Sequence, residues 1–236
     1  MEKVERIVWD DFPEESPDVE FRLVYEGPLK AAGRAGTRVS EKHTIRKQLH
    51  KQLKYLWQAM PQLAMRTKDH LVLNPGRTTW DANKKIQSRS VASSDIQQSL
   101  LVTLGNSFER CGYKFVPLVN NRLKLYCGLD VIFLRRDMPG APLIRSGGDI
   151  DNRLKVLFDA LRIPENCEEL TGATKESDED PYFYCLLEDD ALISELTVTT
   201  DTLLTPYEAG QESDVHLIIK VKVRPFDFSF ETVGFI

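Results

Sequence analysis

Residues 147–162 read Gly-Gly-Asp-Ile-Asp-Asn-Arg-Leu-Lys-Val-Leu-Phe-Asp-Ala-Leu-Arg. Leu154, Leu157, Phe158 and Leu161 recur at the spacing of one face of an α-helix. The two glycines before the helix let the backbone bend sharply. The stretch therefore predicts an amphipathic helix that packs its apolar face on a sheet and leaves its polar start free.

The polar residues of this stretch gather at the start of the helix. Asp151 opens the helix, Lys155 follows one turn later on the same side, and Asp149 lies two residues before Asp151. Helix capping needs only one carboxylate, and two neighbouring carboxylates repel unless a divalent cation lies between them. A second acidic cluster, Glu188-Asp189-Asp190, precedes the strand-like run 191–198. We therefore expect the two clusters to close on one metal site.

These motifs resemble a known family. Asp149-Ile-Asp151-Asn152-x-x-Lys155, then Phe158-Asp159-Ala160-Leu161, then Asp189-Asp190 before a strand, are similar to the motifs of RusA-family Holliday junction resolvases. The resemblance covers about residues 122–200 and, more weakly, 20–58. It implies a dimeric, magnesium-dependent endonuclease that cuts branched DNA.

The resemblance also implies roles for single residues. Asp149, Asp151 and Asp190 would be catalytic metal ligands, and Asp189 an auxiliary ligand. Lys155 would be the catalytic lysine, which steadies the scissile phosphate or the leaving oxygen. The cofactor would be Mg²⁺, with Mn²⁺ as a substitute. A role for Glu188 does not follow from the resemblance.

The fold class that we expect is α+β, with helices packed on a mixed β-sheet. Residues 1–20 would form an acidic N-terminal arm, and residues 21–236 a single RusA-like nuclease domain. Insertions are expected at about 62–112 and 165–184, the second of them mobile.

Hydrophobic periodicity predicts the individual elements of this fold. Helices are expected from Ser40 to Met60, and from Ser94 to a stop at Cys111-Gly112. Residues 113–119 and 122–136 should form a β-hairpin around Asn120-Asn121. Further strands are expected at 21–25, 192–199 and 215–223.

Composition restricts the class of protein. Of the 236 residues, 42% are hydrophobic and 28% are charged, which is typical of a globular protein with a sizeable core. No apolar run reaches the roughly 18 residues of a membrane span, and the N-terminus lacks a signal-peptide pattern. We therefore expect a cytoplasmic protein without a membrane partner. The four cysteines show no C-x-x-C pair, so reduced thiols are expected.

The charge distribution favours contact with nucleic acid. The net charge is −5, yet residues 21–164 contain 25 Lys and Arg against 11 Asp and Glu, whereas residues 165–236 contain 4 against 17. A basic body can bind phosphates, although a solvated surface explains single lysines equally well. The residues that we expect to contact nucleic acid are Lys30, Arg34, Arg38, Lys42, Arg46, Lys47, Arg135, Arg136 and Arg145.

Two other functions remain open. The protein could bind nucleic acid without catalysis, its carboxylates only capping a helix. It could also be an interaction module of a phage-related or defence system, with its acidic ends against a basic protein partner. Even for a nuclease, the branched or structured substrate stays open, and a homodimer is expected because a junction is cut symmetrically. A further hypothesis places the acidic segment 165–190, or the N-terminal arm, over the basic face.

Overall fold

The computed structural model describes residues 19–31, 38–59, 93–136, 150–206, 211 and 213–225. Its helices are α1 (Val39–Ala59), α4 (Ser93–Ser107) and α5 (Ile150–Leu161), with short 3-10 helices η2 (Cys167–Leu170), η3 (Ser177–Glu179) and η4 (Asp190–Leu192). Its strands are β1 (Val19–Pro28), β2 (Glu109–Arg110), β3 (Tyr113–Val119), β4 (Leu125–Arg135), β5 (Phe183–Leu187), β6 (Ile193–Thr202) and β7 (Asp214–Pro225).

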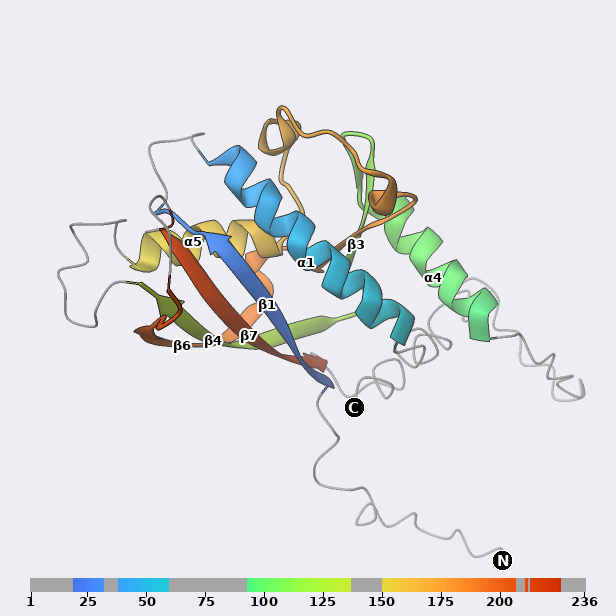
Figure 1. Ribbon diagram of the computed structural model, residues 1–236. Coiled ribbons are helices and arrows are strands. Elements are labelled where there is room, and N and C mark those ends of the chain that lie inside the picture. Colours follow the sequence, from blue (N-terminus) through green and yellow to red (C-terminus); the bar gives the residue numbers. More distant parts are fainter. Residues whose placement is uncertain are drawn as a thin grey trace, which may run out of the picture.

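The main sheet has four strands in the order β1-β7-β4-β6. β7 pairs antiparallel with β1 and β4, whereas β6 pairs parallel with β4, so the sheet is mixed, as expected. α1 and α5 lie on one side of this sheet (Figure 1). The predicted α+β class is therefore confirmed.

Alternating residues of the sheet point into the core. On β4 these are Leu125, Cys127, Leu129, Val131 and Phe133, all of them buried. The apolar sides of α1 and α5 close over them and join the same hydrophobic cluster. The alternation in the sequence thus identified the sheet on which the central helix packs.

The predicted hairpin of 113–119 and 122–136 is wrong. β3 and β4 are both strands, but β3 belongs to a second sheet, β2-β3-β5, and pairs parallel with β5. Asn120 redirects the chain between them, because its side chain accepts a hydrogen bond from the Leu123 amide and donates one to the Pro117 carbonyl. The nearly continuous burial of β3 fits a strand covered on both faces rather than one arm of a hairpin.

Two cysteines contradict the prediction of reduced thiols. Cys111, in the turn between β2 and β3, forms a disulfide with Cys167 of η2. The Cα atoms lie 5.6 Å apart, a usual separation for a disulfide. Cys127 and Cys185 are free and buried, in line with the prediction. The spacing of the cysteines gave no sign of the bond, because 56 residues separate the pair in sequence.

Residues 164–182, which we call the strap, are built into the fold rather than loosely attached. Leu170 of the strap joins a small second hydrophobic cluster with Phe115 and Phe183. Glu179 is only 1% exposed, and residues of the strap contact α1 along its length. The prediction of a mobile insertion at 165–184 is therefore wrong.

Several predicted features lie outside the described residues. They include nearly all of the acidic arm 1–20 and residues 62–92 of the insertion at about 62–112. The rest of that insertion contains α4 and β2. Among the helices described, none is both long and apolar enough to span a membrane.

Candidate functional site

The N-terminal end of α5 presents the polar half of the motif to solvent. Asp151 and Lys155 are exposed, whereas Val156 and Leu157 on the other side are fully buried. Among the described residues, neither Asp151 nor Lys155 has a hydrogen-bond or ion-pair partner. The apolar side therefore fixes the helix, and the carboxylate and the ammonium remain available to a ligand.

Other predicted site residues fall in parts of the chain that the structure does not describe. Asp149 lies one residue before α5, and Arg34 and Arg145 lie in the two segments that precede α1 and α5. Their predicted roles as metal ligand and as nucleic-acid contacts stay predictions.

Asp189 and Asp190 lie in a turn that is held by a hydrogen bond between the Asp189 side chain and a backbone amide of the same turn. The carboxylate of Asp189 accepts a hydrogen bond from the Ala191 amide at 2.9 Å and so caps η4. The preceding Glu188 accepts a hydrogen bond from the Asn121 amide at 2.7 Å. Glu188, whose role the sequence left open, therefore ties this turn to the connection that leads into β4.

The structure does not bring this turn to Asp151. Just beyond the end of α5, the Ile163 amide donates a hydrogen bond to the Leu187 carbonyl at 2.9 Å, so Asp189 and Asp190 follow the C-terminal end of the helix. Asp151 is at the other end, about 16 Å away along the axis at 1.5 Å per residue. The expected convergence is therefore absent among the described carboxylates, because Asp151 lies at the N-terminal end of α5 and the turn that follows Leu187 lies near its C-terminal end.

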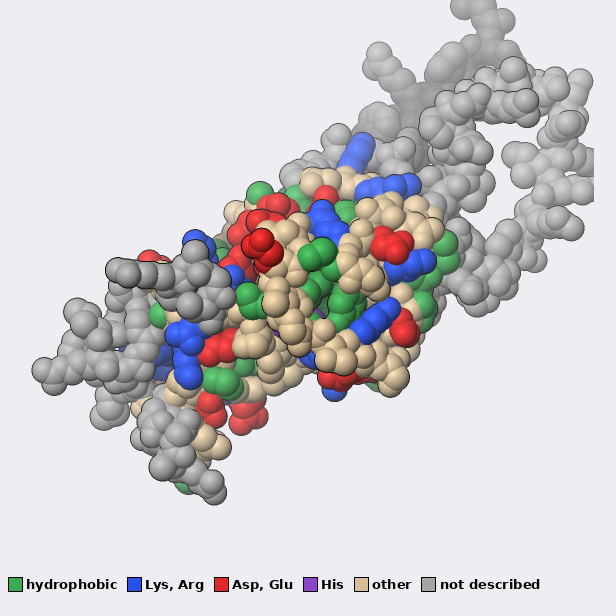
Figure 2. Space-filling model, turned by 90° about the horizontal axis from the view of Figure 1, so that it is seen from above, with side chains coloured by type: hydrophobic (Ala, Val, Ile, Leu, Met, Phe, Trp, Pro, Cys, Tyr) green, Lys and Arg blue, Asp and Glu red, His purple; other side chains and the backbone are tan. Residues whose placement is uncertain are grey.

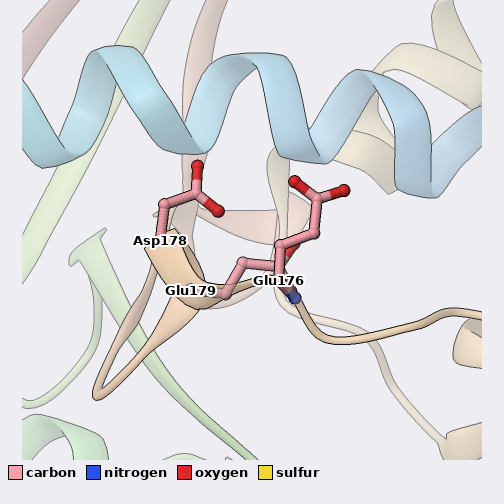
Figure 3. Close-up of side chains that lie close together, drawn as sticks. All are labelled: Glu176, Asp178 and Glu179. Atoms are coloured by element: carbon pink, nitrogen blue, oxygen red, sulfur yellow. The ribbon is translucent and has the colours of Figure 1, made fainter.

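One acidic group does come together in the described part of the chain, on the strap. Carboxylate oxygens of Glu176, Asp178 and Glu179 lie within 4.8 Å of one another. Figure 3 shows the side chains of Glu176 and Asp178 directed toward α1. The acidic run 176–180, within the insertion that the sequence predicts at about 165–184, is the signal that could have indicated this group.

A lysine already neutralises this acidic group. Lys47 Nζ lies 2.7 Å from Glu176 and 3.4 Å from Glu179. Burial alone would lower the pKa of Lys47, but the hydrogen bond to Glu176 and the charge of Glu179 outweigh it and raise that pKa. The hydrogen bond from Lys47 likewise lowers the pKa of Glu176. An ammonium thus occupies the position that a metal ion would need.

The basic side of α1 is largely turned toward the protein itself. Arg46 is 1% exposed, and its guanidinium donates hydrogen bonds to the carbonyls of Asp159 and Arg162. Lys42 Nζ lies 2.6 Å from the Asp159 carboxylate. Arg46 is therefore a buried structural residue and not the nucleic-acid contact that we expected, because a phosphate cannot reach it.

The other predicted contacts lie where the strands β1 and β4 end. Arg135 is buried at 6% exposure, which corrects its assignment to the surface. Arg136 donates to the Thr205 carbonyl, and Arg38 forms an ion pair with Glu41 at 3.0 Å. The side chain of Lys30 is 48% exposed, with Glu41 4.0 Å away. This is also the end of the sheet toward which α5 points its N-terminus (Figure 1).

The surface over α1 and the strap is electrostatically mixed. Figure 2 shows acidic and basic side chains side by side on this face. A groove of about 650 Å³ runs here between α1 and the strap, lined by His43, Lys47, Glu176 and neighbouring threonines. The predicted basic body is thus partly neutralised by the acidic segment, as the hypothesis of a covered basic face expected.

Comparison of the chain with protein-family models, with curated proteins and with solved structures found no match.

Proposed function

We propose that the protein is a metal-dependent endonuclease that hydrolyses phosphodiester bonds in branched DNA such as Holliday junctions. The observation that carries this proposal is the exposed Asp151–Lys155 pair at the start of α5, without a partner among the described residues. A carboxylate and a lysine one helical turn apart match the motif on which the resemblance to RusA-family resolvases depends. Packing in the core accounts for the apolar residues of α5. It does not account for Asp151 and Lys155, which are exposed.

The donor groups at this end of α5 suit Mg²⁺. Asp149 and Asp151 supply hard carboxylate oxygens, and Mg²⁺ is commonly held by one or two carboxylates together with waters and substrate phosphate. Such an ion supplies an activated water and relieves the charge of the phosphate. Mn²⁺ has the same ligand preference and would substitute. Asp189 and Asp190 are ligands by resemblance only, because the turn that holds them lies at the other end of α5.

Lys155 would act on the phosphate directly. Its ammonium is exposed on the same side of α5 as Asp151, and the N-terminus of a helix also attracts anions. In this arrangement Lys155 holds a non-bridging or leaving oxygen of the scissile phosphate. It stabilises the negative charge that develops there as the bond breaks.

DNA would approach from the end of the sheet where β1 and β4 end. Lys30, Arg38 and Arg136 of the described residues lie there, and Arg34 and Arg145 belong to the adjoining segments of the sequence. Cutting a junction on two symmetric strands requires a homodimer with a twofold axis. In this proposal the protein acts in the cytoplasm, as expected from its sequence.

The test is cleavage of an end-labelled four-way junction with and without Mg²⁺, beside flaps, forks and RNA-containing branches. Wild type should cut, and Asp151→Asn should bind the same DNA without cutting it. Asp180→Asn is the matched control, because Asp180 is on the strap, with its side chain 62% exposed. Wild type that cuts no substrate at any Mg²⁺ or Mn²⁺ concentration would refute the nuclease.

One observation favours a second candidate, a nucleic-acid-binding protein without catalysis. The carboxylates of the described residues do not converge at Asp151, which then would only begin a helix. In the same assay this candidate predicts metal-independent binding of junctions and no cleavage. Absence of both binding and cleavage would instead indicate a protein-interaction module, with a protein partner for its acidic ends.

A further inference from the structure

The disulfide is open to solvent, unlike the free cysteines. Cys111 and Cys167 are both exposed. Cys111 and Gly112 form a two-residue turn with φ of 54° and 79°, a conformation that a residue other than glycine, asparagine or aspartate seldom adopts. Cys127 and Cys185 are buried, and burial raises the pKa of each thiol to about 12, so they do not react readily. The exposed pair is thus the one that reductants can reach.

The disulfide fastens the beginning of the strap to the β2–β3 turn. Neighbouring bonds join the same two segments: Arg110 donates to the Pro164 carbonyl, and Lys175 donates to the Gly112 carbonyl. The donors of both bonds are exposed side chains, so water competes with the protein for these hydrogen bonds. The disulfide is therefore the strongest link between the strap and this turn.

Further along, the strap covers a row of lysines on α1. Lys47, Lys51 and Lys54 follow at helical spacing on one side of that helix. Lys47 contacts the carboxylates of Glu176 and Glu179, Lys51 lies 3.8 Å from Asp178, and Lys54 donates to the Asp178 carbonyl. Carboxylates at Lys47 and Lys51 and a backbone carbonyl at Lys54 thus take the place that phosphates would take on a basic helix.

We propose that the Cys111–Cys167 disulfide is a site of reversible thiol–disulfide exchange, and that its reduction loosens the strap from the lysine row of α1. A dithiol is the reductant: its thiolate attacks one sulfur, the S–S bond breaks, and the other cysteine leaves as a thiolate and takes up a proton. The second thiol of the reductant then closes its own disulfide and releases the first cysteine. Two electrons pass from the dithiol to the protein. Exposed disulfides are the ones that a thiolate can reach and reduce.

The consequence for DNA rests on the proposed function. In the oxidised protein the strap competes with phosphates for two of these lysines, through the carboxylates of Glu176 and Glu179 at Lys47 and through the Asp178 carbonyl at Lys54. In the reduced protein the ammonium groups of Lys47 and Lys54 become available beside the already exposed Lys51, and junction affinity should rise, most clearly at low salt. The N-terminal end of α5 is unaffected, so the metal dependence of cleavage stays the same in both states.

Hydrogen–deuterium exchange of the wild-type protein with and without dithiothreitol tests the strap directly, without DNA. We expect amides of residues 164–182 to exchange about tenfold faster, or more, after reduction, with α5 unchanged. Iodoacetamide should then label Cys111 and Cys167 but not Cys127 or Cys185. Unchanged exchange of the strap in protein whose Cys111 and Cys167 are fully labelled would overturn the proposal, as would equal acceleration throughout the molecule.

A variant and a second readout separate this inference from the proposed function. Cys111→Ser should exchange like reduced wild type and show no response to dithiothreitol, and a response would contradict the inference. Faster strap exchange without any DNA binding would support the redox site and refute the nuclease. Junction cleavage by a protein whose strap ignores dithiothreitol would refute the redox site alone.

Discussion

Lys42 of α1 and Asp159 of α5 form an ion pair with a distance of 2.6 Å between Nζ and Oδ2. The pair is one edge of a charged network in which Arg162 also contacts Asp159 and Glu169, each at 3.1 Å. Arg46 completes it from α1, 3.4 Å from Glu169. Lys42 and Arg46 are two of the basic residues for which the sequence predicted contact with nucleic acid. In the structure they instead join α1 to α5 and to η2.

Replacement of Arg46 by methionine should destabilise the protein strongly. The buried guanidinium binds two carbonyl groups and Glu169, and methionine removes this donor from both carbonyls and leaves Arg162 as the remaining cation beside Glu169. We expect the free energy of unfolding in urea to fall by about 3 kcal/mol. Lys51→Met is the control on the same helix: its side chain is 63% exposed, and a loss below about 1 kcal/mol is expected. Equal losses for the two variants would show that Arg46 has no structural role.

His43 should make the fold sensitive to acid. Burial, together with the charges of Arg46 and Lys47, lowers its pKa from 6.5 to about 4, against the smaller opposing effect of Glu176. The unfolded chain therefore binds a proton at higher pH than the folded protein does, so stability is full above pH 6.5 and is lost as the pH falls toward 4. The loss should amount to about 3 kcal/mol.

His43→Phe keeps an aromatic ring beside Tyr113 and Phe183 but cannot titrate. Urea unfolding between pH 7 and 4 should show a flatter profile for this variant than for wild type. His50, whose pKa burial also lowers, and Glu176, whose pKa the hydrogen bond from Lys47 lowers, contribute to the slope that remains. Parallel profiles for the variant and wild type would contradict the assignment.

Lys155→Met should abolish most cleavage and leave the fold intact. An ammonium that stabilises developing charge on a phosphate typically contributes about 10²–10³ in rate, and Lys155 is exposed, so its removal costs little stability. We expect the single-turnover cleavage rate to fall by that factor while junction affinity changes little. Lys222→Met, on the outer face of β7, should cut at the wild-type rate. A Lys155→Met enzyme with a wild-type rate would remove the lysine from the mechanism.

The local elements could be predicted from the sequence because each has its own hydrophobic period. Apolar residues recur every three or four positions along α5 and at every second position along β4 and β7, because each element buries one face. The structure confirms all three elements. The wrong prediction of a hairpin around Asn120 has a different origin. Two adjacent strands joined by a short polar turn also fit a chain that changes sheets, and only the partners β5 and β7 decide between the two.

Contacts between distant segments could not be predicted in the same way. The Cys111–Cys167 bond and the pairing of Lys47 with Glu176 depend on where η2 and the strap cross over other elements, which no local pattern encodes. The acidic run 176–180 has the composition of a solvated loop, and its position over α1 follows from charge complementarity across 129 residues. The sequence motif 149–155 likewise identifies ligand types without deciding which other carboxylates join them.

The central claim is that the carboxylates at the start of α5 hold the divalent cation. Calorimetric titration of Mn²⁺ into wild type, Asp151→Asn, Asp190→Asn and Asp178→Asn measures this directly, because it needs neither DNA nor turnover. The account predicts that Asp151→Asn weakens Mn²⁺ binding about tenfold or more, while Asp190→Asn and Asp178→Asn bind as wild type does. Wild-type affinity in Asp151→Asn, or loss of binding only in Asp190→Asn or Asp178→Asn, would contradict it.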